Sequence, residues 1–242
     1  GRACAQTFSR EGASVVILSR TPEDIAGAAE AIENEGGTVL AARVDVASPD
    51  EIEEVVAETI SVFGRIDILM NNAAILGPPR VILEIESEDW DHTMDINLKG
   101  VFLFSRAVIP QMKKQGAGKI INVTSGLAEI AMPPFGAYSI SKAGVNHLTR
   151  IMAEELRAFN IQVNALDPGI MDTIMQERIR QLGPEILGEA MAEQFETFHT
   201  GGHLKKPEDI APLAVFLASG DSDLITGEIG SELDYSTYGY NL

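Results

Sequence analysis

Short apolar runs alternate with longer stretches of helical period along the chain from residue 15 onward. The apolar runs predict strands at 15–19, 38–46, 66–73, 119–125, 161–166 and near 228–233. Between these runs, apolar residues recur every three or four positions, which is typical of amphipathic helices. Strands that alternate with helices form βαβ units, so the pattern predicts an α/β fold with a doubly wound, mostly parallel sheet.

Two helix starts are marked by an N-cap residue followed by proline. Thr21 precedes Pro22, and Ser48 precedes Pro49, with Glu51 in the position of a capping-box acid. We therefore expect a helix to begin at each proline.

The first residues break the alternation, because 1–12 predict a helix that ends at Gly12 and no strand comes before it. A doubly wound sheet begins with a strand and a glycine-rich turn, whose amides face a pyrophosphate at the start of the first helix. At most the last glycine of that turn, Gly1, is present. We therefore expect a truncated sequence, since a natural fold without that strand would leave a gap in the middle of its sheet.

Composition indicates one domain and a reducing compartment. The chain has 242 residues, 45% of them hydrophobic, and shows no repeat, low-complexity tract or linker, so we expect a single domain over 1–242. The only cysteine, Cys4, leaves no intramolecular disulfide or metal-binding cluster, which suits a cytoplasmic protein. No run approaches the roughly 18 apolar residues needed to span a bilayer, so we expect no membrane partner.

The charge balance argues against nucleic-acid binding. Lys and Arg number 18 against 36 Asp and Glu, which gives a net charge of -18. Such a chain repels phosphate backbones unless it carries a local basic patch. The lysine pairs at 113–114 and 205–206 are isolated, so we expect no nucleic-acid partner.

Four polar residues are candidates for catalysis. Tyr138 and Lys142 stand four apart in a helical stretch, a spacing that also occurs in solvated pairs. Ser125 ends a predicted strand, and Asn97 lies in a helical stretch between two others. Alone, Ser125 is better explained as a strand-end hydroxyl and Asn97 as a helix-kink or cap residue. Open α/β sheets bind ligands at the carboxyl ends of their strands, so the four together predict a site at this edge.

These motifs, with "NNAA" at 71–74 and "DPG" at 167–169, make the chain resemble the short-chain dehydrogenase/reductase family from Gly1 to about Thr226. That resemblance implies a single-domain Rossmann fold and hydride transfer between a nicotinamide cofactor and a carbonyl or alcohol. It implies that Tyr138 exchanges the proton and that Ser125 orients the substrate oxygen. It further implies that Lys142 lowers the pKa of Tyr138 and holds the cofactor ribose, and that Asn97 helps to anchor a relay water.

The resemblance also implies cofactor contacts. Together with Tyr138 and Lys142, the positions are Gly1, Ser19, Arg20, Asp45, Val46, Asn72, Ala73, Ala74, Pro168, Gly169 and Thr173. A strand-end aspartate can instead simply cap a turn, which is an open alternative for Asp45 and the favoured interpretation of Asp167.

The choice between NAD(H) and NADP(H) depends on the residues at the end of predicted strand 15–19. Ser19 stands where an acidic residue would select NAD, and Arg20 follows it, so NADP(H) is favoured over NAD(H). Alternatively, Arg20 stacks over the adenine, and Glu23 and Asp24 serve as helix N-terminal charges.

Three departures from the family pattern stand out. Ala74 replaces a glycine of the usual "NNAG", the glycine-rich loop is missing except for Gly1, and the C-terminus lacks an Asp-Gly-Gly ending. Each concerns backbone packing or the cofactor loop rather than the four candidate catalytic residues.

The segment 170–204 occupies the place of the family's substrate lid. Its apolar residues recur at helical spacing and suit a core stripe as well as a substrate wall: Met171, Met175, Ile179 and Leu182. His199 and His203 are four apart, but the intervening "TGG" argues against a metal site.

The sequence thus predicts an oxidoreductase for a small or medium carbonyl or secondary alcohol, with alcohol, sugar and steroid-like substrates all open. A 3-oxoacyl-carrier-protein reductase is the first candidate, although an acidic carrier would be repelled by a chain at -18. An epimerase or dehydratase would append a substrate domain for which too little chain follows Tyr138. A non-catalytic nucleotide sensor or scaffold is the remaining alternative. The resemblance further implies a homotetramer or homodimer formed through the long helices.

Overall fold

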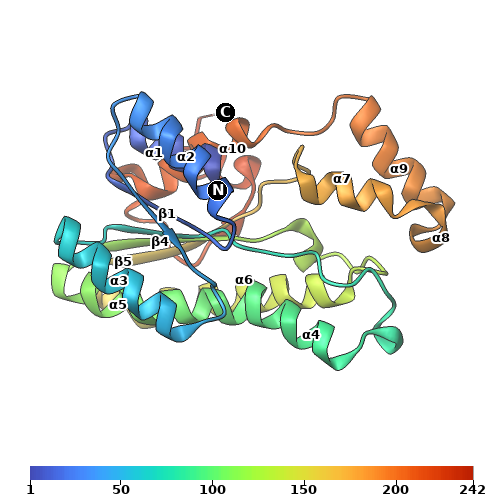
Figure 1. The fold of residues 1–242 in the computed structure, drawn as a ribbon, viewed down its shortest axis with the longest axis horizontal. Coiled ribbons are helices and arrows are strands. Elements are labelled where there is room, and N and C mark those ends of the chain that lie inside the picture. The colour runs from blue at the N-terminus through green and yellow to red at the C-terminus, as the bar shows by residue number, and fades with distance from the viewer. Residues whose placement is uncertain (242) are drawn as a thin grey trace.

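A computed structural model describes residues 1–241 as an α/β fold with helices on both faces of parallel strands (Figure 1). The strands are β1 (Val15–Ser19), β2 (Val39–Arg43), β3 (Ile68–Asn71), β4 (Gly118–Val123), β5 (Ile161–Leu166) and β6 (Ile229–Gly230). The larger helices are α1 (Arg2–Arg10), α2 (Pro22–Asn34), α3 (Pro49–Phe63), α4 (Ser87–Met94), α5 (Gly100–Gln115), α6 (Gly136–Leu156), α7 (Ile174–Gln181), α8 (Gly183–Leu187), α9 (Glu189–Thr200), α10 (Pro207–Ala218) and α11 (Glu232–Ser236). The predicted α/β class is confirmed.

Short helical segments connect these elements. They are η1 (Ile82–Glu84), η2 (Asp95–Lys99), η3 (Gly126–Ala128), η4 (Arg157–Phe159) and η5 (Gly220–Ser222). The segment η2 is a π-helix that joins α4 to α5 without a break.

All strand pairs are parallel, and they fall into two groups. One group is the β1–β2 pair, and the other has the order β3-β4-β5-β6. Within residues 1–241 no ladder joins the two groups. One apolar cluster nevertheless includes Val16 of β1, Leu69 of β3 and Ile120 of β4, so both groups share a core.

Helices cover the two faces of the strands. In Figure 1, α3, α5 and α6 lie below the sheet, and α1, α2 and α10 lie above it. Five of the six residues of β4 and all six of β5 are buried. Burial on both faces explains why these strands read as continuous apolar runs rather than as alternating ones.

Several predicted boundaries are wrong at their ends. Strand 38–46 is shorter than expected because pairing stops at Arg43, and Asp45 begins a turn in which its Oδ1 accepts from Ala47 N at 2.9 Å. The last strand keeps only Ile229 and Gly230, because a capping box between Ser231 and Asp234 starts α11 there.

The two predicted helix starts are correct, but their caps differ from expectation. Ser48 Oγ accepts from Glu51 N at 3.4 Å, whereas the Glu51 carboxylate accepts from Asp45 N at 2.8 Å. The expected capping box is therefore only half formed, since Glu51 is committed to the end of β2. Thr21 makes no side-chain capping bond.

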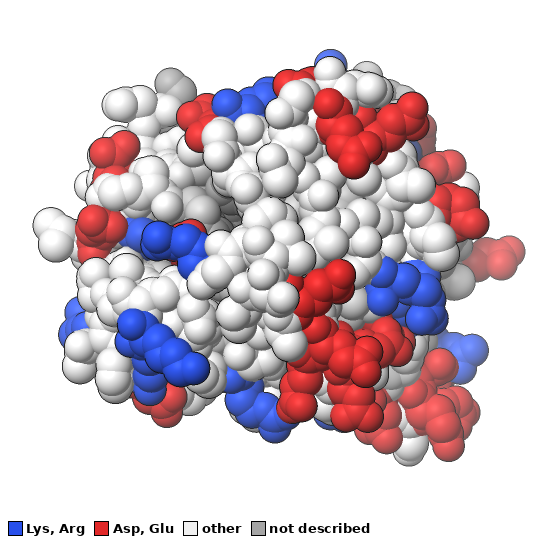
Figure 2. Space-filling view, turned by 60° about the vertical axis from the view of Figure 1, so that its left-hand side comes forward, with Lys and Arg blue, Asp and Glu red and all other residues white. Residues whose placement is uncertain are grey.

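Charge is unevenly spread over the surface. Figure 2 shows acidic side chains in several groups between wide uncharged areas, and basic side chains in small separate groups on the same face. One acidic group lies beside β2 on α3, where Glu51, Glu54 and Glu58 line a shallow hollow with Arg43. Among residues 1–241 no helix combines the length and hydropathy needed to cross a bilayer.

Candidate active site

The carboxyl ends of β4 and β5 bring the candidate catalytic residues together. Ser125 lies two residues after the end of β4 and caps η3, where its Oγ accepts from Leu127 N at 3.2 Å. Tyr138 and Lys142 lie in the first two turns of α6, which packs against both η3 and β5. Three of the four predicted catalytic residues therefore meet at one rim.

Tyr138 is largely buried, with 8% of its surface exposed. Burial raises the pKa of Tyr138 because it disfavours the charged phenolate, while a hydrogen bond from Ser125 acts in the opposite direction. The negative charge of Asp167 adds to the rise in this pKa. The phenol is therefore held in its protonated form in this state of the protein.

Lys142 is 2% exposed, and its Nζ donates to the Val123 carbonyl at 2.7 Å. Burial lowers the pKa of Lys142 to about 8. Its Nζ lies 5.8 Å from the centre of the Tyr138 ring. The lysine was expected to lower the pKa of Tyr138, but in this structure burial of the phenol outweighs any such effect.

Asn97 lies on η2 and is fully buried. Its Oδ1 accepts from Ile75 N at 2.8 Å, and its Nδ2 donates to Ile75 O at 2.8 Å and to Ser141 Oγ at 3.0 Å. Ser141 Oγ in turn donates to the Tyr138 carbonyl at 2.6 Å. The Asn97 side chain thus ties the loop after β3 to the helix that carries Tyr138.

Ser141 was not singled out from the sequence. Its signal was a small hydroxyl three residues after Tyr138, where a serine can bond back to the preceding helical turn.

Buried asparagine side chains join the strands whose ends carry the candidate site. Asn71, at the end of β3, donates from Nδ2 to Asn122 Oδ1 at 2.9 Å, and Asn122 donates to Thr149 Oγ1 at 2.8 Å. These bonds tie two strands to α6. The first asparagine of the "NNAA" motif therefore supports the sheet.

The next residues of that motif face the start of α1. Gly1 N donates to Asn72 Oδ1 at 3.1 Å, and a Cβ on Gly1 would lie 2.8 Å from Asn72 Nδ2. Only glycine permits this approach without a shift. Ala73 is exposed and Ala74 is half-buried beside them.

A second group of predicted cofactor residues lies at the ends of β1 and β2. Ser19 Oγ accepts from Thr21 N at 3.1 Å, and an Arg20 guanidinium nitrogen lies 3.9 Å from Asp45 Oδ2. Val46 packs against α5, where a Cβ on Gly100 would come within 3.1 Å of it. Arg20 and Asp45 therefore share one edge, and Val46 has a packing role there.

The loop after β5 carries the remaining predicted contacts. Gly169 has a φ of +72°, and its N donates to Asp167 Oδ1 at 2.9 Å. Pro168 precedes it, half-buried. Thr173 caps α7, where its Oγ1 accepts from Gln176 N at 3.4 Å. This loop leads from the end of β5 into α7, the first helix of the predicted lid.

These residues fit a dinucleotide cofactor. Within the described part of the chain, no side chain caps the first turn of α1, and such a helix start suits phosphate groups. Arg20 lies half-exposed at the β1–β2 edge. In the lid, Gln176 is 8% exposed, and its Oε1 has no partner among the described residues, so an acceptor is left for a bound group.

The predicted lid forms α7, α8 and α9. Its own apolar cluster includes Ile179, Leu187 and Phe195, which pack against Phe135 just before α6. Met175 and Leu182 join this cluster, whereas Met171 packs with the cluster around α10. The predicted stripe is therefore split, because Met171 precedes α7 and pairs instead with Lys205.

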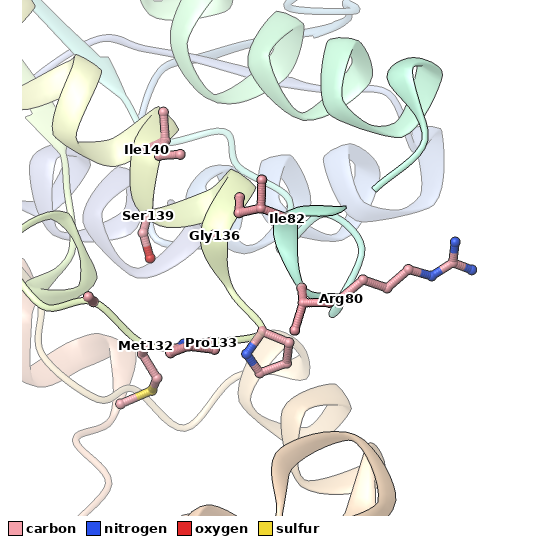
Figure 3. A pocket seen from close by; sticks show the side chains of 10 residues that line it. Arg80, Ile82, Met132, Pro133, Gly136, Ser139 and Ile140 are labelled. Carbon is pink, nitrogen blue, oxygen red and sulfur yellow. The ribbon is translucent and has the colours of Figure 1, made fainter. Parts of the chain in front are cut away.

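A separate apolar hollow of about 330 Å³ lies along the outer side of α6 (Figure 3). Its lining includes Arg80, Ile82, Met132, Ser139 and Ile140, and none of the four predicted catalytic residues. In Figure 3 the guanidinium of Arg80 points away from the hollow. We therefore do not assign this hollow to the catalytic cleft.

The chain is similar in sequence and fold to known oxidoreductases. Residues 1–231 match the family model described as enoyl-(acyl carrier protein) reductase. The chain is 36% identical over 229 residues to the 3-oxoacyl-[acyl-carrier-protein] reductase FabG of Thermotoga maritima, covering 95% of this chain and 89% of that protein. It is 37% identical over 232 residues to an NAD-dependent glycerol dehydrogenase of Listeria innocua, covering 94% and 85%. The crystal structure of levodione reductase superposes with a TM-score of 0.88 at 29% identity, covering 100% and 94%.

Proposed function

The chain belongs to the short-chain dehydrogenase/reductase family and is an NAD(P)-dependent oxidoreductase, and from this premise we propose how its residues perform the reaction. Tyr138 is the general acid in carbonyl reduction and the general base in alcohol oxidation. The observation that carries this assignment is the buried phenol of Tyr138 beside Ser125 and Lys142 at the end of β4.

Each residue has a distinct role in this proposal. The bound nicotinamide supplies or accepts the hydride. Tyr138 donates its proton to the substrate oxygen, and Ser125 donates a hydrogen bond to the same oxygen and fixes its orientation. Lys142 holds a cofactor hydroxyl and stabilises the phenolate left behind. Asn97 and Ser141 hold α6 against the loop after β3.

Tyr138→Phe tests this assignment. Loss of the proton donor should lower turnover by roughly 10²–10⁴-fold, because general acid–base catalysis contributes that much. Cofactor affinity, measured by fluorescence titration, should stay within about twofold. Ser125→Ala should likewise reduce turnover and spare cofactor binding. Full turnover by Tyr138→Phe would refute the assignment of Tyr138 as the general acid. Full turnover by Ser125→Ala would refute only the role of Ser125 in orienting the substrate oxygen.

The proposed cofactor contacts form two sets. We assign the cofactor phosphates to Gly1, Asn72, Ala73 and Ala74, and the nicotinamide to Pro168, Gly169 and Thr173. Arg20 selects NADP(H) by pairing with the additional phosphate, for which its half-exposed position is the support. The nearby Asp45 carboxylate and the NAD-dependent glycerol dehydrogenase among the relatives support the NAD(H) alternative.

A 3-oxoacyl thioester is the first substrate candidate. Support comes from the likeness to the Thermotoga reductase. The glycerol dehydrogenase supports a small polyol instead. Initial rates on an acetoacetyl thioester, dihydroxyacetone and glycerol would separate these substrate classes.

The remaining assignments concern the whole molecule. We propose one NAD(P)-binding domain with a substrate lid at about 170–204, in a homotetramer or homodimer within a reducing cytoplasm. The shared apolar core supports the single domain, and the free, buried Cys4 is compatible with that compartment. Light scattering measures the oligomeric state directly.

A further inference from the structure

The side chain of Asn146 holds both ends of the segment that carries Ser125. Asn146 lies within α6 and is 2% exposed. Its Oδ1 accepts from Thr124 Oγ1 at 2.5 Å, and its Nδ2 donates to Glu129 Oε1 at 3.2 Å. Thr124 directly precedes Ser125, and Glu129 is the C-cap of η3, the short helix that follows it. One buried amide therefore attaches both flanks of Ser125 to α6.

The bonds inside this segment are local. Leu127 N donates to Ser125 Oγ at 3.2 Å, and Ala128 N donates to Ser125 O at 2.9 Å. Both bonds join near neighbours in the chain, so they shape η3 without fixing its place on α6. The two bonds of Asn146 span 22 and 17 residues of sequence, and they attach the segment to the helix.

Asn146 shares one face of α6 with the proposed proton donor. Tyr138, Lys142 and Asn146 are spaced by four residues, which places them one above the other on a helix. Lys142 Nζ donates to Val123 O at 2.7 Å, so the same face also holds the end of β4. The position of Ser125 relative to Tyr138 therefore depends on how this face is bonded to β4 and η3.

We propose that Asn146 is a positioning residue that sets the place of the Ser125 hydroxyl relative to the Tyr138 phenol. This proposal rests on the proposed roles of Tyr138 and Ser125 in carbonyl reduction. Without the bonds of Asn146, the Ser125 hydroxyl spends less time in the geometry that orients the substrate oxygen. Turnover then falls while cofactor binding is kept, because none of the proposed cofactor contacts lies in 124–129.

Asn146→Ala removes both bonds and leaves Tyr138 in place. In this variant kcat should fall by about 10- to 100-fold, because a small misplacement of an orienting group is that costly. The Kd of the cofactor, measured by fluorescence titration, should keep its wild-type value. The substrate is an acetoacetyl thioester or dihydroxyacetone, whichever the wild type reduces faster. A wild-type kcat in Asn146→Ala would overturn the proposal.

Asn164→Ala is the matched control, because Asn164 is also a buried asparagine with one accepted and one donated bond. It is 2% exposed, its Oδ1 accepts from Glu228 N at 3.1 Å, and its Nδ2 donates to Ile225 O at 2.8 Å. Asn164→Ala should lower stability as Asn146→Ala does, and it should keep the wild-type kcat. Equal losses of kcat in the two variants would show a general effect of lost packing and overturn the proposal.

Ser125→Ala distinguishes an effect that acts through Ser125 from one that acts elsewhere. In the Ser125→Ala background no hydroxyl is left to position, so adding Asn146→Ala should cause almost no further loss of kcat. The same substitution should cause its full loss in the wild-type background. Losses that simply multiply would show that Asn146 acts elsewhere and would overturn the proposal.

Thr124 tests the same contact from its other partner. Thr124→Ser keeps the hydroxyl that donates to Asn146 and loses a methyl group, whereas Thr124→Val keeps the size and loses the hydroxyl. Thr124→Val should lose turnover as Asn146→Ala does, and Thr124→Ser should stay near the wild-type rate. The reverse order would assign Thr124 and Asn146 to packing alone and overturn the proposal.

A fluorine signal reports the arrangement without turnover. The four tyrosines are replaced by 3-fluorotyrosine, and the ¹⁹F resonance lost in Tyr138→Phe identifies that site. Ser125 hydrogen-bonds the Tyr138 phenol, so Ser125→Ala should move this resonance. Asn146→Ala should move it in the same direction, and Asn164→Ala should leave it in place. An unmoved resonance in Asn146→Ala would overturn the proposal. If the wild type reduced no carbonyl, the proposed function would fail, and the resonance would still decide whether Asn146 positions Ser125.

Discussion

The two groups of strands have similar apolar sequences but very different environments. Strands β4 and β5 are almost fully buried, whereas every residue of β1 is only half-buried. The reason is pairing, because β4 and β5 have neighbours on both sides and β1, within residues 1–241, pairs only with β2. The proposed catalytic residues lie at the ends of the β3-β4-β5-β6 group, and Ser19, Arg20 and Asp45 lie at the end of the β1–β2 pair. The proposed chemistry thus sits on the more tightly packed part of the sheet, and the proposed cofactor choice on the more open part.

Truncation of one isoleucine in each strand group should show the difference in burial most strongly. Ile120→Ala in β4 removes a side chain that is 1% exposed, and should lower the free energy of unfolding by about 3–4 kcal/mol. Ile17→Ala in the half-buried β1 should cost only about 1–2 kcal/mol. Urea denaturation of both variants measures the two values. Equal losses would show that the division between the strand groups has no energetic meaning.

Lys142 should make the stability of the catalytic part depend on alkaline pH. Its folded pKa of about 8 lies below the usual value of 10.5, so the folded state disfavours the charged form. This penalty is complete below about pH 8 and is relieved as pH rises toward 10.5, so the contribution of Lys142 to stability should increase over that window.

Lys142→Met lacks this penalty and provides the comparison. The stability of the wild type relative to Lys142→Met should rise between pH 8 and 10.5 by up to about 3 kcal/mol. Chemical denaturation at several pH values measures that difference. A constant difference would show that the lysine is charged throughout the range.

Arg20 should affect binding without affecting stability. Arg20→Ala should weaken NADPH binding about ten- to hundredfold and leave NADH binding unchanged, because only NADPH carries the additional phosphate. The loss of its exposed contact with Asp45 should change the unfolding free energy by less than about 0.5 kcal/mol. Arg65→Ala, at the amino end of β3, is the control with the same charge change. Equal loss of both cofactors would remove the selecting role from Arg20.

The sequence predicted the more strongly patterned parts of the fold. Strands 15–19 and 161–166 have the predicted bounds, because apolar runs of strand length lie between clear helical stretches. The end of the chain was predicted less well, since Ser231 and Asp234 form a local helix cap in a stretch that reads as a strand. The role of Glu51 was missed because its partner, Asp45 N, belongs to another element.

Prediction of the candidate site from the sequence was limited in the same way. Spacing was enough to identify Tyr138, Lys142 and Ser125 as candidates, because strand ends and one helix face bring them to a common rim. The bond from Asn97 to Ser141 depends on how η2 packs on α6, and the contact of Asn146 with the residue after β4 depends on how α6 packs there. Neither contact leaves a local signal in the sequence, so the structure was needed to find them.

The most direct test of the account is the consumption of NADPH and NADH by the wild-type chain with a panel of carbonyl compounds, followed by absorbance at several pH values. The account predicts carbonyl-dependent oxidation of the reduced cofactor that falls at high pH as Tyr138 loses its proton. Binding of either cofactor without turnover of any carbonyl would contradict it and would favour a nucleotide-sensing protein on the same fold.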